Sequence, residues 1–130
     1  MSETPERRFK VLIVEDDVQI LRVLRLELEH EGYLVDTASD GLSGLEKALK
    51  EPDLVILDVM LPKMDGLEVC TRVRAKSRVP IVMLTTRAEP AERARGAQVG
   101  ASDYIVKPFD TDDLLRRVQD ALSNPAPRLS

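Results

Sequence analysis

The sequence has few of the residues that staple small proteins together or anchor them in membranes. Among its 130 residues are one cysteine, one histidine and no tryptophan. The lone Cys70 excludes an internal disulfide, and the lone His30, with no cysteine near it, argues against a zinc site. No segment approaches the roughly 18 apolar residues of a membrane span, and residues 1–8 lack the apolar stretch of a signal peptide. We therefore expect a cytoplasmic protein with no membrane contact.

The charge balance of the chain argues against nucleic-acid binding. The chain carries 19 basic and 23 acidic side chains, for a formal net charge of −4. Nucleic-acid binding depends on clustered Lys and Arg that neutralise phosphates. We therefore do not expect this chain to bind DNA by itself, and DNA contact would require a further domain outside this sequence.

Length and composition fit one globular domain. With 43% hydrophobic and 32% charged residues, 130 residues can bury one continuous core. We expect a flexible amino terminus over 1–8, a domain over 9–123, and a linker or tail over 124–130. The tail contains Pro125 and Pro127 and has no hydrophobic period, so it can lead to a missing output domain.

Four short apolar runs each end on a polar functional group. They are Val11 to Val14 before Glu15, Asp16 and Asp17; Leu54 to Leu57 before Asp58; Ile81 to Leu84 before Thr85; and Tyr104 to Val106 before Lys107. Runs of this length, rich in β-branched residues and without alternation, are typical of buried parallel strands. Ligands of such sheets bind beyond the carboxyl ends of the strands, so these groups are expected to share one rim.

Amphipathic stretches alternate with the strands and predict an α/β fold with a doubly wound parallel sheet. We expect helices over about 18–31, 41–50, from Asp65–Gly66 to before Pro80, 90–99 and 110–122, and a strand at or near the sheet edge over 33–38. Asp17, Asp40 and Asp110 are expected N-caps. The fourth helix has only Ala91, Ala94, Ala97 and Val99 to bury, and it is our candidate for the mobile element.

The acidic residues at the rim predict a cation site. Carboxylates about 4 Å apart repel by roughly 4 kcal/mol per pair at an effective dielectric constant near 20. Mg²⁺ prefers such oxygen ligands and commonly binds phosphate oxygens as well. The alternative is that Glu15, Asp16 and Asp17 are acids at a helix start, favoured by the macrodipole. Asp58 and Lys107 weigh against that alternative.

Together these residues resemble the receiver domains of two-component response regulators, across 9–123. The resemblance is carried by Val11 to Asp17, Leu57 to Gly66, Met83 to Thr85, and Asp103 to Phe109, in this order. Any one motif would be weak, but the ordered set is specific. It implies a flavodoxin-like fold, with five parallel strands in the order 2-1-3-4-5 and five helices.

The resemblance also implies roles for the residues at the rim. Asp58 would accept a phosphoryl group from a phosphohistidine of a sensor histidine kinase, or from a small donor such as acetyl phosphate. Mg²⁺, or Mn²⁺ in its place, would be held by Glu15, Asp16, Asp58 and the backbone carbonyl of Met60. Lys107 would pair with a phosphoryl oxygen, Thr85 would donate its hydroxyl to the product, and the Lys107–Pro108 peptide is expected to be cis. No independent enzyme is expected beyond phosphorylation of Asp58 and its slow reversal.

A switch and an output follow from the same resemblance. Movement of Thr85 toward the phosphoryl group would let Tyr104 turn inward; the alternative is a static strand aromatic. Segments 97–104 and 114–118 further resemble the OmpR/PhoB class of DNA-binding regulators, in which phosphorylation pairs two subunits. Carried over by position, this predicts a homodimer with contacts Arg93 to Asp113 and Asp103 to Arg117. The alternative is a pair within one helix, since Asp113 and Arg117 are spaced i,i+4.

Two other functions remain open at this point. An Mg²⁺-dependent phosphohydrolase would also use an aspartyl phosphate, but such enzymes commonly place a second Asp two residues after the nucleophile, where this chain has Met60. A receiver-shaped interaction module that takes no phosphate is the other alternative. Because Met60 and Arg87 flank the site without a group that orients water, we expect slow loss of the phosphoryl group. Thr86, where the family commonly has a small Ala, is expected to crowd the site and alter its rates.

Overall fold

The computed structural model describes residues 8–86 and 90–123. Within them, five parallel strands form one sheet in the order β2-β1-β3-β4-β5. The strands are β1 (Lys10–Val14), β2 (Leu34–Ala38), β3 (Leu54–Asp58), β4 (Ile81–Thr85) and β5 (Asp103–Val106). The predicted flavodoxin-like sheet is therefore confirmed, with the strand order that the resemblance implied.

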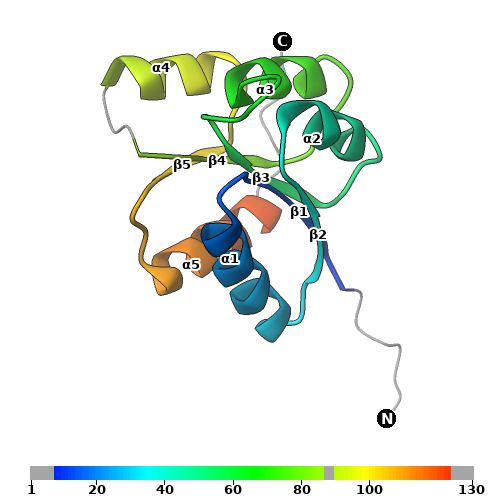
Figure 1. Cartoon of the computed structure of the whole chain (residues 1–130), viewed down its shortest axis with the longest axis vertical. Coiled ribbons are helices and arrows are strands. Elements are labelled where there is room, and N and C mark those ends of the chain that lie inside the picture. The colour runs from blue at the N-terminus through cyan, green and yellow to red at the C-terminus, as the bar shows by residue number, and fades with distance from the viewer. Residues whose placement is uncertain (1–7, 87–89, 124–130) are drawn as a thin grey trace.

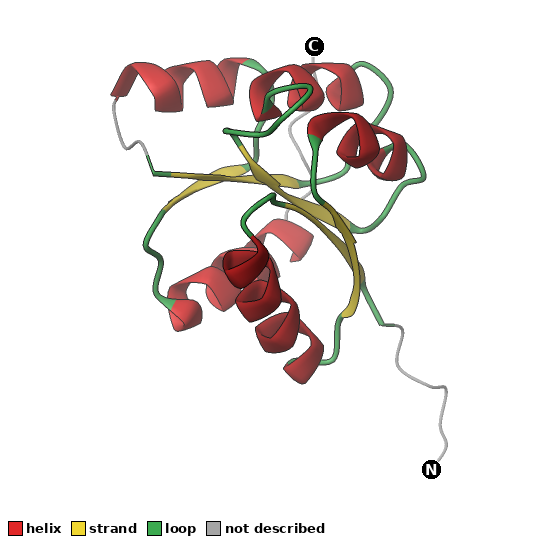
Figure 2. Cartoon of the chain, viewed as in Figure 1, coloured by secondary structure: helices red, strands yellow, loops and turns green. Residues whose placement is uncertain are grey.

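Helices cover both faces of this sheet (Figures 1 and 2). The helices α1 (Val18–His30) and α5 (Thr111–Ser123) lie on one face, and α2 (Gly41–Ala48), α3 (Gly66–Arg74) and α4 (Pro90–Gln98) lie on the other. Each face has its own apolar cluster, the first built on Leu24 and Leu28 of α1, the second on Val69 and Val73 of α3. A sheet with helices on both faces buries its central strands completely, and β3 and β4 are buried at every position.

The strand bounds agree with the apolar runs to within a residue. β2 begins at Leu34 rather than at Tyr33, and it lies at the sheet edge, where its exposure alternates. No helix in the described part of the chain has both the length and the apolar composition that crossing a bilayer requires.

Aspartates start the helices where the sequence predicts them. Asp17 accepts the N–H groups of Gln19 and Ile20, and Asp40 accepts that of Ser43 at 2.8 Å. At the starts of α3 and α5, Asp65 accepts from the Glu68 N–H at 3.0 Å and Asp110 from the Asp113 N–H at 3.1 Å. Each cap satisfies helix N–H groups that have no partner inside the helix, so these starts are fixed locally.

Two predictions about the helices are wrong. α2 ends at Ala48, two residues before the predicted end, because the chain then turns through Glu51, which has φ of 59°. In α4, Ala91, Ala94 and Ala97 were expected to be buried, but all three are exposed. The helix instead turns Gly96 toward the sheet, where an added Cβ would lie 2.4 Å from the Tyr104 ring. The absence of a side chain at Gly96 therefore decides which face of α4 is buried.

Candidate functional site

The carboxyl ends of β1 and β3 bring three carboxylates together. Glu15 and Asp16 follow β1, and Asp58 is the last residue of β3. One ligand oxygen from each of Glu15, Asp16 and Asp58 lies within 4.8 Å of the others. Glu15 and Asp58 are buried and Asp16 is exposed, so the cluster opens to solvent on one side. The acids predicted to share a rim therefore do so.

Lys107, just beyond β5, supplies the positive charge of this cluster. Its Nζ lies 2.8 Å from Glu15 Oε1 and 3.4 Å from Asp58 Oδ2. β5 is separated from β3 by β4 in the sheet, so the approach requires the Lys107 side chain to reach across the end of β4. The peptide between Lys107 and Pro108 is cis, the isomer that the resemblance favoured.

Burial and charge shift the pKa values of this pair. Burial raises the pKa of Glu15 above its ordinary value, and the hydrogen bond from Lys107 only partly offsets that rise. For Lys107, burial lowers the pKa, but the hydrogen bond to Glu15 and the charges of Asp58 and Glu15 outweigh burial and leave the pKa raised. Lys107 is therefore firmly protonated and provides a fixed cation beside Asp58.

Backbone N–H groups orient the carboxylates. The Asp17 N–H donates to Glu15 Oε2 at 3.0 Å, and the Met60 N–H donates to Asp58 Oδ1 at 3.2 Å. The Met60 side chain points outward and is 57% exposed. Local turns after β1 and β3 therefore orient one oxygen of each acid, and Lys107 contacts the other oxygen.

The acids line an open pocket of about 360 Å³ together with Asp17, Met60, Thr86 and Lys107. Thr85 ends β4 beside this pocket and is fully buried, whereas Thr86 is exposed on the pocket wall. The pocket has room for a hydrated cation and a phosphoryl-sized group. Its oxygen donors are the type that Mg²⁺ and Mn²⁺ accept, so the residues present fit such an ion.

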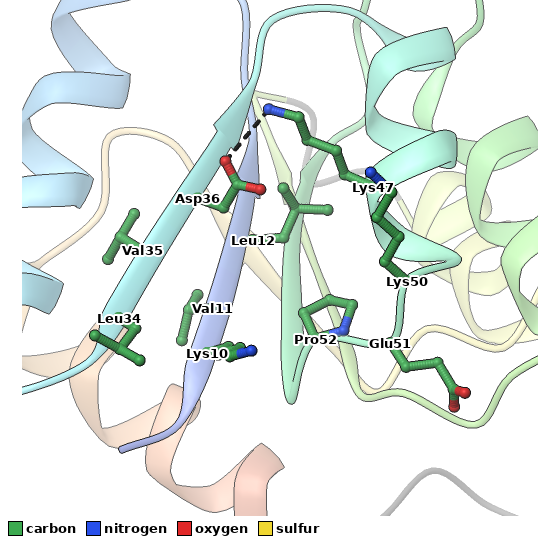
Figure 3. A pocket seen from close by; sticks show the side chains of 10 residues that line it. All are labelled: Lys10, Val11, Leu12, Leu34, Val35, Asp36, Lys47, Lys50, Glu51 and Pro52. Atoms are coloured by element: carbon green, nitrogen blue, oxygen red, sulfur yellow. Dashed lines mark hydrogen bonds and ion pairs between the residues drawn. The ribbon is translucent and has the colours of Figure 1, made fainter.

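A second pocket, of about 290 Å³, lies at the opposite end of β1 (Figure 3). It begins at Lys10, the first residue of β1, and is bordered by Leu34, Asp36 and Lys47. Lys47 is engaged there, since its Nζ lies 3.3 Å from Asp36 Oδ1 and donates to the Thr37 carbonyl at 2.6 Å. This pocket contains no converging acids, and we do not assign it a role.

Of the residues predicted for the switch and the dimer face, Thr85 ends β4, and the others lie on α4, β5 and α5. Tyr104 lies on β5 with its ring against Gly96. Arg117 bonds Asp113 at 3.0 Å and Asp103 at 2.8 Å within the same chain. These contacts include the i,i+4 pair that was the local alternative, and they hold the pKa of Asp113 below its ordinary value. The side chain of Arg93 is outside the described residues.

Two glycines that the sequence marked only as helix starts lie against the end of β3 and the segment that follows it. An added Cβ on Gly66 would lie 2.2 Å from the Asp58 carbonyl oxygen, and one on Gly41 would lie 1.9 Å from the Met64 carbonyl oxygen. Both glycines directly follow a capping aspartate, Asp65 or Asp40. That pattern signals a helix start, but the close approach of a second segment depends on the fold.

Comparisons with known proteins agree with this geometry. The family described as the response regulator receiver domain matches residues 11–119. Response regulator ArlR of Staphylococcus epidermidis is 49% identical over 113 residues, covering 86% of this chain and 52% of that protein. ArlR of Staphylococcus aureus is 47% identical over 114 residues, covering 87% of this chain and again 52% of the relative. The chain thus spans about half the length of these curated relatives.

Solved structures of similar fold include receivers from two other bacteria. Chemotaxis response regulator CheY4 of Vibrio cholerae has a TM-score of 0.83 and 39% identity, covering 88% of this chain and 99% of that one. The receiver domain of a Pseudomonas aeruginosa sensor histidine kinase, described with a magnesium ion in its active-site cleft, has a TM-score of 0.83 and 31% identity, covering 91% and 100%. With its acids, its lysine and its sheet order all in place, this chain belongs to the response regulator receiver domains of two-component systems.

Proposed function

We propose that this chain accepts a phosphoryl group on Asp58 from a sensor histidine kinase. The observation that carries the proposal is the position of Lys107 Nζ, 3.4 Å from Asp58 Oδ2 and 2.8 Å from Glu15 Oε1. Such a cation next to a buried carboxylate can stabilise charge that develops on a transferring phosphoryl group. We place the protein in the cytoplasm, with a kinase as its partner.

In the proposed step, a carboxylate oxygen of Asp58 forms a bond to phosphorus. The bond from phosphorus to the histidine nitrogen of the kinase, or to the acetate oxygen of acetyl phosphate, breaks, and its electron pair leaves with the donor. Because a carboxylate nucleophile has no proton to lose when it attacks, this step requires no general base. The Lys107 ammonium would bind an oxygen of the transferred group, and the Thr85 hydroxyl would donate to another.

Mg²⁺ would be held by Glu15, Asp16, Asp58 and the backbone carbonyl of Met60. When bound, it would supply positive charge that stabilises the oxygens of the transferred group. The Asp17 N–H contacts Glu15 Oε2 and the Met60 N–H contacts Asp58 Oδ1, while Lys107 contacts the other oxygen of each carboxylate. Because each carboxylate oxygen has two lone pairs, both acids keep acceptor sites for a metal ion. Mn²⁺ can serve in its place, since it accepts the same ligands.

The output that we propose is transcriptional, through a region outside this sequence. The two regulators compared above are about twice as long as the matched segment, and both are named response regulators. In this proposal phosphorylation moves Thr85 and then Tyr104, and the face of α4, β5 and α5 forms a homodimer. The predicted contacts, Arg93 to Asp113 and Asp103 to Arg117, would form by exchanging the bonds that Arg117 makes within one chain.

A charge reversal tests the dimer part of the proposal. Arg117→Glu is expected to abolish phosphorylation-dependent dimerisation, measured by size-exclusion chromatography. Arg72→Glu, on the exposed side of α3, is the control and should leave the dimer intact. Dimerisation that survives Arg117→Glu would refute the intersubunit contact.

We further propose that the phosphoryl group is lost slowly. Thr86 is exposed on the pocket wall, and the Met60 side chain cannot orient water because it has no polar atom that bonds strongly. Arg87, the other flanking residue, lies outside the described residues. Loss of the phosphoryl group within seconds would contradict this expectation.

The phosphoacceptor is tested by intact mass after incubation with Mg²⁺ and acetyl phosphate. A single phosphoryl adduct is expected on the wild type and none on Asp58→Asn. An adduct on both proteins would show that a residue other than Asp58 accepts the phosphoryl group. No adduct on either, followed by no adduct from a phosphorylated kinase, would favour the phosphate-independent module. Steady turnover of a phosphomonoester would instead favour the phosphohydrolase, and we expect none.

A further inference from the structure

The first turn of α2 lies against the loop that follows Asp58. Gly41 donates its backbone N–H to the Pro62 carbonyl oxygen at 3.0 Å. A Cβ added at Gly41 would lie 1.9 Å from the Met64 carbonyl oxygen and 2.7 Å from the Met64 carbonyl carbon. These are backbone atoms, which cannot rotate away as a flexible side chain can. Glycine therefore allows α2 and the loop to come this close, and any other residue would push them apart.

The same loop reaches the Asp58 carboxylate. The Met60 N–H donates to Asp58 Oδ1 at 3.2 Å. The far end of the loop is fixed where the Gly66 N–H donates to the Val59 carbonyl at 2.8 Å. Between these points Lys63 has φ of 71°, a conformation that residues with a Cβ adopt only when their surroundings impose it. The contact with α2 is one of the surroundings that hold the loop in this shape.

A side-chain contact accompanies the backbone contact but is weaker. Asp40, which caps α2 through the Ser43 N–H, has Oδ2 at 3.7 Å from Lys63 Nζ. The Lys63 side chain is 62% exposed, and exposed ion pairs contribute little. We therefore attribute the positioning of the loop mainly to Gly41.

From these contacts we propose that Gly41 is a positioning residue of the phosphoacceptor site, acting through the loop over 60–64. The inference rests on the proposed function, in which this loop supplies the Met60 carbonyl to Mg²⁺. A side chain at Gly41 would displace the loop and, with it, both the N–H on Asp58 and that carbonyl. Residues that orient metal ligands typically change affinity by about 10- to 100-fold when mutated, although they touch neither metal nor substrate.

The test is the Mg²⁺ affinity of Gly41→Ala before any phosphorylation. Titration followed by backbone amide NMR shifts is expected to give a dissociation constant about 10- to 100-fold above that of the wild type. Phosphorylation by acetyl phosphate should slow in parallel at subsaturating Mg²⁺. Circular dichroism checks that the variant is folded.

Two control variants separate positioning from general loss of stability. Gly32→Ala strains a glycine with φ of 96°, two residues after the end of α1 and at the opposite end of the sheet from the acids. It should lower the melting temperature and leave the Mg²⁺ dissociation constant unchanged. Asp40→Asn keeps a good N-cap and removes only the charge beside Lys63, so its Mg²⁺ affinity should stay within about twofold of the wild type.

A second measurement uses the wild type and does not depend on the folding of a variant. Coupling between two sites is reciprocal, so Mg²⁺ must stabilise the Gly41 contact if the contact favours Mg²⁺ binding. Hydrogen exchange of the Gly41 N–H should slow at saturating Mg²⁺, whereas exchange of the Gly32 N–H, bonded to the Glu29 carbonyl, should not.

The outcomes distinguish this inference from the proposed function. Three results would each overturn this inference but not the proposed function. They are a folded Gly41→Ala variant with the Mg²⁺ affinity of the wild type, equal losses of Mg²⁺ affinity in Gly41→Ala and Gly32→Ala, and a hydrogen-exchange rate of the Gly41 N–H that does not change with Mg²⁺. A wild type that binds no Mg²⁺ and takes no phosphoryl group would refute the proposed function and this inference with it.

Discussion

Replacing Lys107 by methionine removes a charge between two buried carboxylates while keeping the length of the side chain. The side chains of Glu15 and Asp58 are 1% and 4% exposed, and the ammonium lies 2.8 and 3.4 Å from them. At an effective dielectric constant near 20, charges at these distances attract by about 6 and about 5 kcal/mol, before the cost of desolvation. Most of that attraction offsets burial of the three charged groups.

The net effect is therefore smaller than the sum of the attractions. Removing one partner of a buried ion pair typically costs about 3–5 kcal/mol, because a charge stays buried without its partner. We expect the free energy of unfolding of Lys107→Met to fall by about 3 kcal/mol without divalent cations. Partial solvent access through the open pocket places the expectation at the lower end of that range.

Urea unfolding at pH 7 in the presence of a chelator, followed by far-UV circular dichroism, measures this loss. Lys76→Met is the matched control, since Lys76 is exposed and its replacement should change stability by less than about 0.5 kcal/mol. A Lys107→Met variant as stable as Lys76→Met would refute our account of the charge balance. It would mean that protonation or water, rather than Lys107, offsets the cost of burying the two carboxylates.

Four further predictions concern Mg²⁺ binding, the reactivity and the titration of the thiol, and a buried arginine. At Mg²⁺ ten times its dissociation constant, the wild type should gain about 1.4 kcal/mol, a gain that a chelator removes and that Asp16→Asn lacks. Burial raises the pKa of the Cys70 thiol to about 11, so the native protein should react with a disulfide reagent at pH 8 at least about 100-fold more slowly than the urea-unfolded protein. From about pH 9 to 11 the unfolded thiol ionises while the folded one does not, so this group makes stability fall as pH rises, and Cys70→Ala should remove that part of the slope. Arg74 donates to the carbonyls of Gly100 at 2.7 Å and Val79 at 2.8 Å, so Arg74→Met should cost about 2–4 kcal/mol in urea unfolding by leaving these acceptors unpaired.

Each of these predictions has a contrary result. Equal stabilisation of Asp16→Asn and the wild type by Mg²⁺ would show that Asp16 does not bind the cation. Rapid labelling of native Cys70 would show that α3 opens far more often than its burial implies. A loss below about 1 kcal/mol in Arg74→Met would show that water replaces the guanidinium.

The strands and the helix starts could be predicted because their causes are local. The run Leu54 to Leu57 is apolar at every position, and in the structure it is buried on both faces of the sheet. Asp17 and Asp40 cap helices through N–H groups only two or three residues away. Such short-range bonds depend on neighbouring residues and need no distant partner.

The acidic rim could also be predicted, for a topological reason. Once the runs before Glu15 and Asp58 are identified as parallel strands, the carboxyl ends must lie at the same edge of the sheet. The motifs around these residues then resembled a family, and the comparison confirmed the family over residues 11–119.

Other features could not be predicted because they join segments far apart in the sequence. Arg74 reads as one of several basic residues at a helix end, yet it is buried and bonds Gly100, 26 residues away. The exposed face of α4 was predicted wrongly because apolar alanines suggested one side, whereas packing of Gly96 on Tyr104 decided the other. Neither contact has a periodic signal.

The sequence by itself determined the α/β alternation, the capped helix starts and the identity of the acids at the rim, since these follow from neighbouring residues and from strand direction. Only the tertiary structure decided that Lys107 reaches both Glu15 and Asp58, that Arg117 bridges Asp103 and Asp113 within one chain, and that Gly41 lies against the loop that follows Asp58. The physical reason is that distances between strands and loops depend on how the whole core packs, and a linear pattern of residue types does not contain those distances.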